Sequence, residues 1–171
     1  MKSGTPMNKI IFVDMDGVLC DFNAFYEQKF GITPQAVRHM KDHSFYREYW
    51  NRLIDEKGFY HLPWMQGAQE LVEWLDKQPY QKCILSSSGG FDRHSEVQSQ
   101  KLMWLCEHGI TWPAMIVPGS GFKAGFANKY RALIDDTDYV IDAFRDRMGF
   151  GVLHKAEAKW DTYYQLEKWL A

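Results

Sequence analysis

Two aspartates, separated by a single residue, stand directly after an apolar run near the start of the sequence. The run from Ile10 to Val13 is followed by Asp14 and Asp16, and then by Gly17. Two carboxylates this close repel each other unless a cation lies near them. Carboxylates bind hard cations such as Mg²⁺, and they also serve as nucleophiles and as proton carriers. The pair therefore indicates a cation-assisted catalytic site.

Further polar clusters follow other apolar runs of the chain. Ser86 to Ser88 follow one run, Lys123 stands in the loop after another, and Asp135 and Asp136 end a third. In an open parallel sheet, the ligand crevice lies outside the carboxyl ends of the strands. A cation, a lysine and hydroxyls there can neutralise a phosphoryl group while a carboxylate attacks its phosphorus. The sequence therefore predicts phosphoryl chemistry through an aspartyl-phosphate that water hydrolyses.

The apolar pattern predicts an α/β fold. Strands are expected at 9–13, 82–90, 114–121, 130–136 and 149–154, with helices at 67–78, 94–109 and 138–149. Strands alternating with helices of this length indicate a parallel sheet with helices on both faces. We expect a Rossmann-like sheet in a three-layer α/β/α arrangement.

One interval breaks the alternation of strands and helices. Residues 20–66 show helical periodicity and no convincing strand. We expect a small helical cap, inserted after the first strand and lying over the carboxyl edge of the sheet. The α/β core then comprises residues 8–19 and 67–171, and residues 1–7 are expected to form a disordered leader.

Bulk properties narrow the class of protein. With 171 residues, 46% hydrophobic and 25% charged, the chain fits one globular domain. A net charge of −2 gives no strong case for a nucleic-acid partner. The odd number of cysteines, 3, at long spacings indicates a reducing, cytoplasmic compartment. No apolar run reaches the ~18 residues of a membrane span, so no membrane partner is expected. A monomer and a homodimer both fit.

The motifs resemble those of a known superfamily. "DMDGV" matches D-x-D-G-[TV], the signature of the haloacid dehalogenase superfamily of phosphohydrolases. The serines of "ILSSS", the lysine of "GFKAGFAN" and the pair in "LIDD" stand in that superfamily's order. More narrowly, "DMDGVLCDF", "GFYHLPWMQGA", "ILSSS" and "ALIDD" resemble the 5′(3′)-deoxyribonucleotidases and their phage and bacterial relatives. The resemblance covers roughly residues 8 to 155.

The resemblance implies roles for the carboxylates. Asp14 would be the nucleophile, and Asp16 would protonate the leaving oxygen and then activate water. Asp14, the backbone carbonyl of Asp16 and Asp136 would bind Mg²⁺, with Asp135 as the alternative to Asp136.

The resemblance also implies a phosphate-binding set. Ser86 and Ser87 would hold phosphate oxygens. Lys123 would be the phosphate lysine, with Lys129 as the alternative. Lys101 resembles a second lysine of the nucleotidases, and its alternative is an exposed helix lysine.

Aromatic residues would form the substrate pocket. Phe22, Phe59, Tyr60 and Trp64 occupy positions where the nucleotidases place aromatics, and packing within the cap is the alternative for each. The expected activity is that of a Mg²⁺-dependent phosphomonoesterase, specifically a 5′-nucleotidase for deoxyribonucleoside monophosphates. The alternatives are a phosphatase of another small phosphate ester or of a nucleic-acid end, and a non-catalytic binding module.

Overall fold

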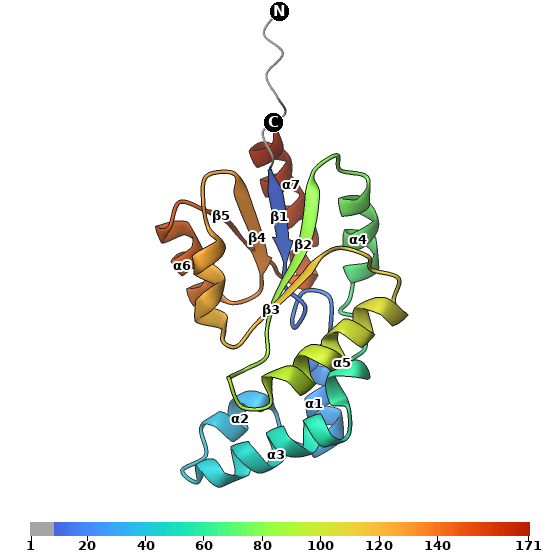
Figure 1. Cartoon of the computed structure of the whole chain (residues 1–171), viewed down its shortest axis with the longest axis vertical. Helices are drawn as coiled ribbons and strands as arrows, with labels where there is room; N and C mark the ends of the chain where they lie inside the picture. Colours follow the sequence, from blue (N-terminus) through green and yellow to red (C-terminus); the bar gives the residue numbers. More distant parts are fainter. Residues whose placement is uncertain (1–8) are drawn as a thin grey trace, which may run out of the picture.

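A single parallel sheet forms the centre of the molecule (Figure 1). The computed structural model describes residues 9–171, so the leader predicted at residues 1–7 lies outside the described residues. The five strands run in the order β3-β2-β1-β4-β5, and every neighbouring pair is parallel. They are β1 (Ile10–Val13), β2 (Gln81–Ser87), β3 (Ala114–Val117), β4 (Arg131–Asp135) and β5 (Phe150–Leu153). The predicted parallel sheet is confirmed.

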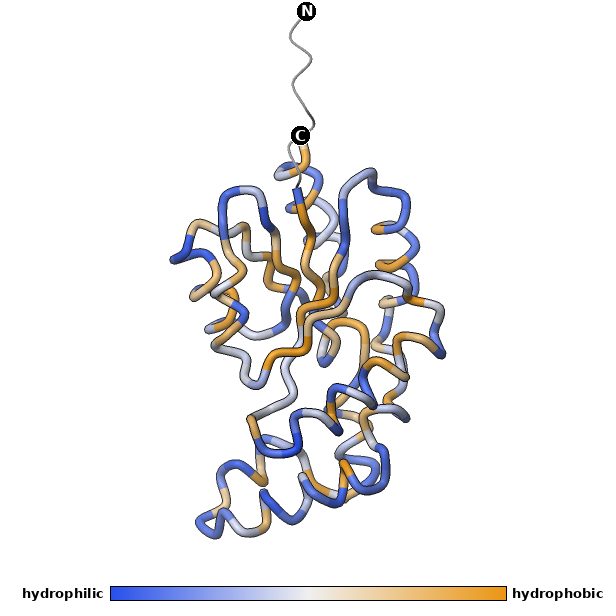
Figure 2. Tube along the Cα trace, viewed as in Figure 1, coloured by the Kyte–Doolittle hydropathy of each residue, from blue (hydrophilic) through white to orange (hydrophobic). Residues whose placement is uncertain are grey.

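Helices cover both faces of this sheet. The side chains of Ile11 and Val13 share a core with Leu166, whereas Phe12 shares a separate core with Phe144. Successive strand residues point to opposite faces, so each apolar strand supplies both cores. The strands are accordingly the most hydrophobic part of the trace in Figure 2. The first core lies under α4 (Ala68–Asp76), α5 (His94–Glu107) and α7 (Lys159–Leu170); the second lies under η2 (Ser120–Phe126) and α6 (Asp138–Asp146). The three-layer prediction is confirmed.

The C-terminal helix α7 has no counterpart among the predicted elements. Its Tyr163 and Leu166 are buried against the sheet, and the short η3 (Ala156–Ala158) leads into it. None of the helices within residues 9–171 combines the length and the apolar character needed to cross a bilayer.

A group of short helices, here called the helical segment, lies between β1 and α4. It comprises α1 (Phe22–Phe30), α2 (Pro34–Arg38), α3 (His43–Asp55) and η1 (Gly58–Tyr60). Asp21, Thr33 and Asp42 cap α1, α2 and α3, because each side chain accepts a hydrogen bond from a first-turn N–H group. Figure 1 shows the helical segment beyond the end of the sheet to which β1 points. The limits 20–66 for a separate cap unit stay a prediction.

The two ends of the helical segment lie side by side. The amide of Asp21 donates to the carbonyl of Pro63 at 2.9 Å, and the amide of Met65 donates to the carbonyl of Leu19 at 2.8 Å. The chain therefore leaves the sheet edge and returns to it at one joint, directly beside the Asp14–Asp16 turn.

Helix α5 anchors the far part of the helical segment. The Gln100 side chain donates to the carbonyl of Ile54 at 2.8 Å and accepts from the amide of Phe59 at 3.2 Å. The Trp104 indole donates to the carbonyl of Leu62 at 2.8 Å. These buried hydrogen bonds satisfy backbone groups that would otherwise be desolvated without a partner. They fix η1 against the α/β core.

The contact between η1 and α3 leaves no room for a side chain at Gly58. A Cβ there would lie 2.2 Å from Cδ1 of Leu53 and 2.8 Å from its carbonyl oxygen. We expect Gly58→Ala to lower the free energy of unfolding by about 1–3 kcal/mol, the usual cost of overpacking. Urea unfolding followed by tryptophan fluorescence measures this change.

Gly121→Ala is the matched control, because a Cβ there meets nothing within 4 Å. We expect its unfolding free energy to stay within about 0.5 kcal/mol of the parent. Equal effects of the two substitutions would contradict the tight seating of η1.

Candidate active site

The first aspartate of the pair continues the central strand. The amide of Asp14 donates to the carbonyl of Ile134 at 3.0 Å, which keeps Asp14 in register with β4. Its Oδ1 accepts a hydrogen bond from the amide of Met15 at 2.8 Å. The chain then turns, because the carbonyl of Met15 accepts from the amides of Leu19 and Cys20. The strand thus fixes Asp14 and the turn positions Asp16.

Each aspartate pairs with its own buried lysine. Lys123 Nζ, from η2, lies 2.9 Å from Oδ2 of Asp14 and donates to Oδ2 of Asp135 at 2.6 Å. Lys101 Nζ, from α5, donates to Oδ2 of Asp16 at 2.7 Å. The two lysines are 2% and 0% exposed, so bulk solvent screens their charges little. The like charges of the aspartate pair are therefore neutralised separately.

The structure distinguishes each predicted lysine from its alternative. Lys123 lies in the cluster, whereas its alternative, Lys129, is exposed and lies over the ring of Tyr130 at 4.9 Å. Lys101 is buried, in disagreement with the alternative of an exposed helix lysine. Burial lowers the pKa of Lys123, but the charges of Asp14 and Asp135 raise it further than burial lowers it, so its ammonium stays protonated.

Asp16 has an environment that favours a bound proton. Although 29% of its side chain is exposed, its Oδ1 is buried and has no hydrogen-bond partner among the described residues. Burial is the main cause that raises the pKa of Asp16, while the charge of Lys101 opposes it and that of Asp14 adds to it. Asp16 therefore holds a proton more readily than an ordinary aspartate does.

Three carboxylates converge beside this pair. Oxygens of Asp14, Asp135 and Asp136 lie within 4.8 Å of one another. Both oxygens of Asp135 are already engaged, one by Lys123 at 2.6 Å and the other by the amide of Thr137 at 3.0 Å. Within residues 9–171, the Asp136 carboxylate accepts a hydrogen bond only from the hydroxyl of Thr137, at Oδ1. Within this acidic triad, Asp136 therefore has the more available oxygen.

Gly17 makes room for the Asp136 carboxylate. Its φ is +82°, and a Cβ would lie 2.0 Å from Oδ2 of Asp136, so no other residue fits here without displacement. Loss of hydration and then the charge of Asp14 raise the pKa of Asp136 to about 6. Asp136, with its raised pKa and available oxygen, lies beside two further carboxylates, and such a group of oxygens matches the donor set of a hard divalent cation. The residues present thus fit a Mg²⁺ ion.

The serines at the carboxyl end of β2 have different partners. Ser86 is buried and accepts from Lys101 at 2.9 Å. Ser87 lines the cleft, and its Oγ accepts from the amide of Gly89 at 3.0 Å, which leaves its own O–H able to donate. Ser88 hydrogen-bonds His94 at 2.7 Å. Of the two predicted phosphate-binding serines, the structure brings Ser87 to the cleft and Ser86 to the Lys101 network.

A cleft of about 440 Å³ lies over these groups. Its floor includes Asp14, Asp16, Lys123 and Asp136 from the α/β core. Its other walls include residues of the helical segment, namely Phe22, Asn23, Pro34, Gln35, Arg38, Tyr46 and Trp50. The predicted catalytic residues and one predicted pocket residue, Phe22, therefore share one cavity.

The other aromatics predicted for the pocket do not line this cleft. Phe59 is 1% exposed and packs behind Phe22, with ring centroids 5.8 Å apart. Tyr60 packs on His61 at 5.0 Å. Trp64 packs on Trp104 at 4.9 Å. The three rings therefore pack against other side chains of the protein.

Three aromatic residues that were not predicted for the pocket line the cleft: Tyr46 and Trp50 from the helical segment, and Tyr139 from α6. Tyr46 and Trp50 stack with centroids 6.2 Å apart and an interplanar angle of 11°. They stand four residues apart on α3, so they share one face of that helix. This spacing of four residues is the feature of the sequence that indicates a shared aromatic face.

The acidic triad predicts a stability that depends on both pH and cation. Because the pKa of Asp136 rises from 3.8 to about 6 on folding, the folded state binds this proton more tightly than the unfolded state does. Without divalent cation, we expect this carboxyl to make the free energy of unfolding fall as pH rises from about 4 to about 6, and Mg²⁺ to offset that loss. Urea unfolding in chelator and in Mg²⁺, at several pH values, measures both effects.

Asp136→Asn should remove this part of the pH dependence and weaken the Mg²⁺ effect. Asp142→Asn, which alters an exposed carboxylate on α6 outside the triad, should leave both unchanged. An identical response to Mg²⁺ in the parent and in Asp136→Asn would count against the triad as a cation site.

Comparison with known proteins bears on the fold. No family model and no curated protein sequence matches the chain. Among solved structures, the chain is similar to a haloacid dehalogenase-like family hydrolase from Streptococcus pneumoniae, with a TM-score of 0.53 and 16% identity over 91% of this chain and 98% of that one. It is also similar to a hydrolase from Streptococcus pneumoniae TIGR4, with a TM-score of 0.51 and 15% identity over 92% and 99% of the two chains. The chain therefore has the fold of haloacid dehalogenase-like hydrolases.

Proposed function

We propose that this protein is a Mg²⁺-dependent phosphomonoesterase of the cytoplasm that acts through an aspartyl-phosphate. One observation carries the proposal: two aspartates of one turn, each paired with its own buried lysine, border a cation-competent acidic triad on the floor of a cleft. The hydrolase fold of its structural neighbours supports the same reaction class. The proposed substrates are small phosphate esters.

Asp14 is the proposed nucleophile. Its carboxylate oxygen bonds to phosphorus as the bond between phosphorus and the ester oxygen breaks, which leaves an acyl phosphate on Asp14. The hydrogen bond from Met15 and the ion pair with Lys123 fix the orientation of this carboxylate before attack. Lys123 and the hydroxyl of Ser87 lie where they can neutralise phosphoryl oxygens.

Asp16 is the proposed general acid and base. In the first step its proton passes to the leaving ester oxygen, so an alcohol departs. In the second step Asp16 takes a proton from water as the water oxygen attacks phosphorus, which releases phosphate and restores the Asp14 carboxylate. Its raised pKa and unpartnered Oδ1 suit a group that gains and loses a proton.

Asp14, Asp136 and the backbone carbonyl of Asp16 would hold the Mg²⁺ ion, with Asp135 committed to Lys123. When bound, the ion would neutralise charge on the phosphoryl group and so lower its repulsion from the attacking carboxylate.

A nucleoside monophosphate, in particular a deoxyribonucleoside 5′-monophosphate, is the proposed substrate within this class. The stacked pair of Tyr46 and Trp50, with Phe22, supplies aromatic faces in the cleft wall. Stacking of a base on such a ring contributes about 1–3 kcal/mol in single-strand binders. The narrow likeness of the sequence motifs to nucleotidases supports the same substrate.

Removal of the nucleophile gives the first test. We expect Asp14→Asn to lower phosphate release by at least about 10³-fold, because an amide oxygen is a poor nucleophile. Phosphate release is measured over a panel of nucleoside and non-nucleoside monophosphates, with Mg²⁺ and with chelator.

Asp142→Asn is the matched control and should keep parental activity, because this exposed carboxylate lies outside the cleft. Activity that survives both chelator and Asp14→Asn would overturn the mechanism. Hydrolysis of the non-nucleoside esters in preference to the nucleotides would overturn the nucleotidase assignment alone.

A second test separates the two duties of Asp16. A nitrophenolate leaves without protonation, whereas the alkoxide of a nucleotide needs a proton. In Asp16→Asn we therefore expect rapid release of about one equivalent of nitrophenol from p-nitrophenyl phosphate, followed by slow turnover, and no such burst of nucleoside from a nucleotide. Rapid-mixing measurements of both products check this.

A parallel burst with the two substrates would contradict the assignment of Asp16 as leaving-group acid. Asp21→Asn, which alters an exposed helix cap beyond the turn, is the control and should turn over both substrates as the parent does.

A further inference from the structure

The part of the cleft wall that comes from the helical segment carries a single charged side chain. Among its lining residues only Arg38 is ionised at neutral pH, and none is a carboxylate. The floor, in contrast, contributes three aspartates and Lys123, whose charge is already paired with Asp14 and Asp135. The cleft therefore has two cationic positions, and they come from different parts of the chain.

Arg38 is the last residue of α2 and is exposed. It takes part in none of the ion pairs found within residues 9–171, whereas Arg52 and Arg93 are both paired with acidic residues. A guanidinium offers five N–H donors in a planar fork that matches a phosphate or carboxylate. Arg38 thus presents an unneutralised, bidentate anion binder to the cleft.

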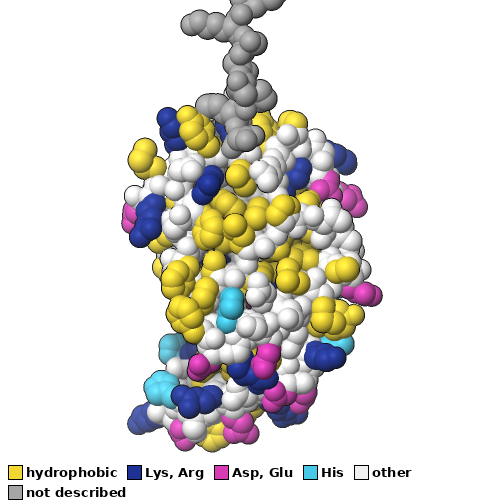
Figure 3. Space-filling view, viewed as in Figure 1, with side chains coloured by type: hydrophobic (Ala, Val, Ile, Leu, Met, Phe, Trp, Pro, Cys, Tyr) yellow, Lys and Arg dark blue, Asp and Glu magenta, His cyan; other side chains and the backbone are white. Residues whose placement is uncertain are grey.

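Polar side chains near Arg38 can also contact a bound anion. Gln35 precedes Arg38 by three residues on α2, so the two side chains lie on one face of the helix, and both line the cleft. Asn23, from α1, lines it as well. Charged side chains gather around the end of the molecule that carries the helical segment (Figure 3), but of these Arg38 is the one that lines the cleft.

Building on the proposed phosphomonoesterase activity, and in place of the simple nucleoside monophosphate as substrate, we propose that the substrate carries a second anionic group on its organic part, and that Arg38 binds this group. In the proposed mechanism the reacting phosphoryl group is bound by Lys123 and Ser87 and by a cation that the acidic triad would hold. A neutral leaving group would give the Arg38 charge nothing to neutralise. Among nucleotides this chemistry corresponds to a nucleoside bisphosphate, and among other esters to a phosphorylated carboxylic acid.

Matched substrate pairs test the proposal. The full-length protein with Mg²⁺ is assayed on a deoxynucleoside 5′-monophosphate and its 3′,5′-bisphosphate, and on phenyl phosphate and 4-carboxyphenyl phosphate. We expect the second anion to raise kcat/KM at least about tenfold in one pair, which equals about 1.4 kcal/mol. The pair that responds tells a phosphate from a carboxylate.

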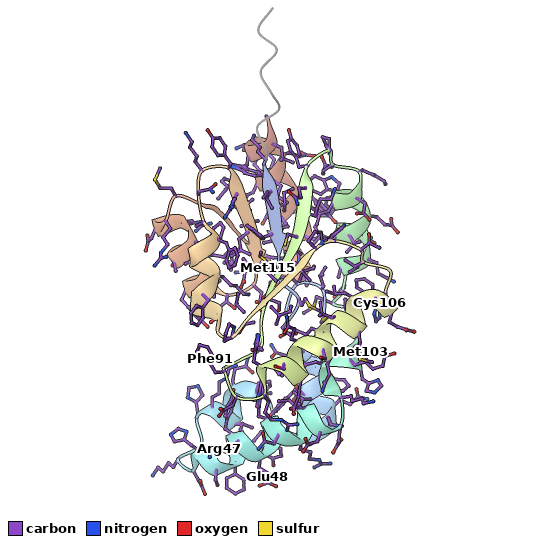
Figure 4. All side chains as sticks on the ribbon, viewed as in Figure 1. Arg47, Glu48, Phe91, Met103, Cys106 and Met115 are labelled. Atoms are coloured by element: carbon purple, nitrogen blue, oxygen red, sulfur yellow. The ribbon has the colours of Figure 1, made fainter. Side chains whose placement is uncertain are left out.

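Variants of Arg38 link that preference to the side chain. Arg38→Gln should bring the ratio of kcat/KM values close to one, and Arg38→Lys should keep part of it because the charge remains. Added salt should lower the ratio, since an exposed arginine is screened. Arg47→Gln is the matched control: Arg47 is exposed on α3 (Figure 4), does not line this cleft, and should leave the ratio unchanged.

A parent enzyme without preference in either pair, or an Arg38→Gln variant that keeps the full ratio, would overturn the inference. Both outcomes still show Asp14-dependent hydrolysis of the simple esters. Loss of the proposed function itself would instead appear as no Asp14-dependent hydrolysis of any ester, and would overturn the inference with it.

Discussion

The site depends on the neutralisation of two carboxylates that the chain places on one turn. The structure gives Asp14 and Asp16 a buried lysine each, Lys123 from η2 and Lys101 from α5. Removing either partner of a buried ion pair leaves the other charge uncompensated. The folded state then loses about 3–5 kcal/mol of stability. The charges therefore hold η2 and α5 against the end of β1. They also separate the environments of the two aspartates, so that one is fixed by paired charges and the other has a raised pKa.

Helix α5 connects this electrostatic constraint to the helical segment. Lys101 reaches Asp16, and its Nζ also lies over the ring of Phe59 at 5.3 Å. The adjacent Gln100 bonds the backbone at Ile54 and Phe59. A displacement of the helical segment would therefore change the surroundings of Asp16 through the contacts of Phe59, Gln100 and Lys101. Phe59 belongs to this coupling, and not to the surface that faces the substrate.

Sequence patterns predicted the sheet and the polar strand ends because these follow local rules. An apolar run that ends in charge or hydroxyl marks a strand whose carboxyl end meets others at one edge, and Asp14, Ser87 and Asp136 do meet there. The same patterns did not show how Phe59 and Trp64 pack, because their partners Gln100 and Trp104 lie about forty residues away along the chain. The sequence patterns also do not place Arg38 in the cleft, because nothing in the sequence distinguishes this arginine from any other exposed arginine on a short polar helix. The C-terminal helix escaped prediction altogether, although its Tyr163 and Leu166 complete the core.

On the proposed phosphomonoesterase mechanism, discrimination between substrates falls to the walls of the cleft. In that mechanism the groups on its floor serve the phosphoryl group, which is the same in every phosphomonoester, so their contacts lower the barrier for all such substrates alike. Only contacts to the remaining part of the molecule can separate one ester from another. The cleft walls that can provide these contacts include residues of α1, α2 and α3, which offer rings, amides and the guanidinium of Arg38, and also Tyr139 of α6. Aromatic stacking tolerates many flat groups, whereas a guanidinium that stays unpaired without a second anion favours a doubly charged ester. Arg38 is therefore the side chain of this wall with the largest capacity to set the substrate class.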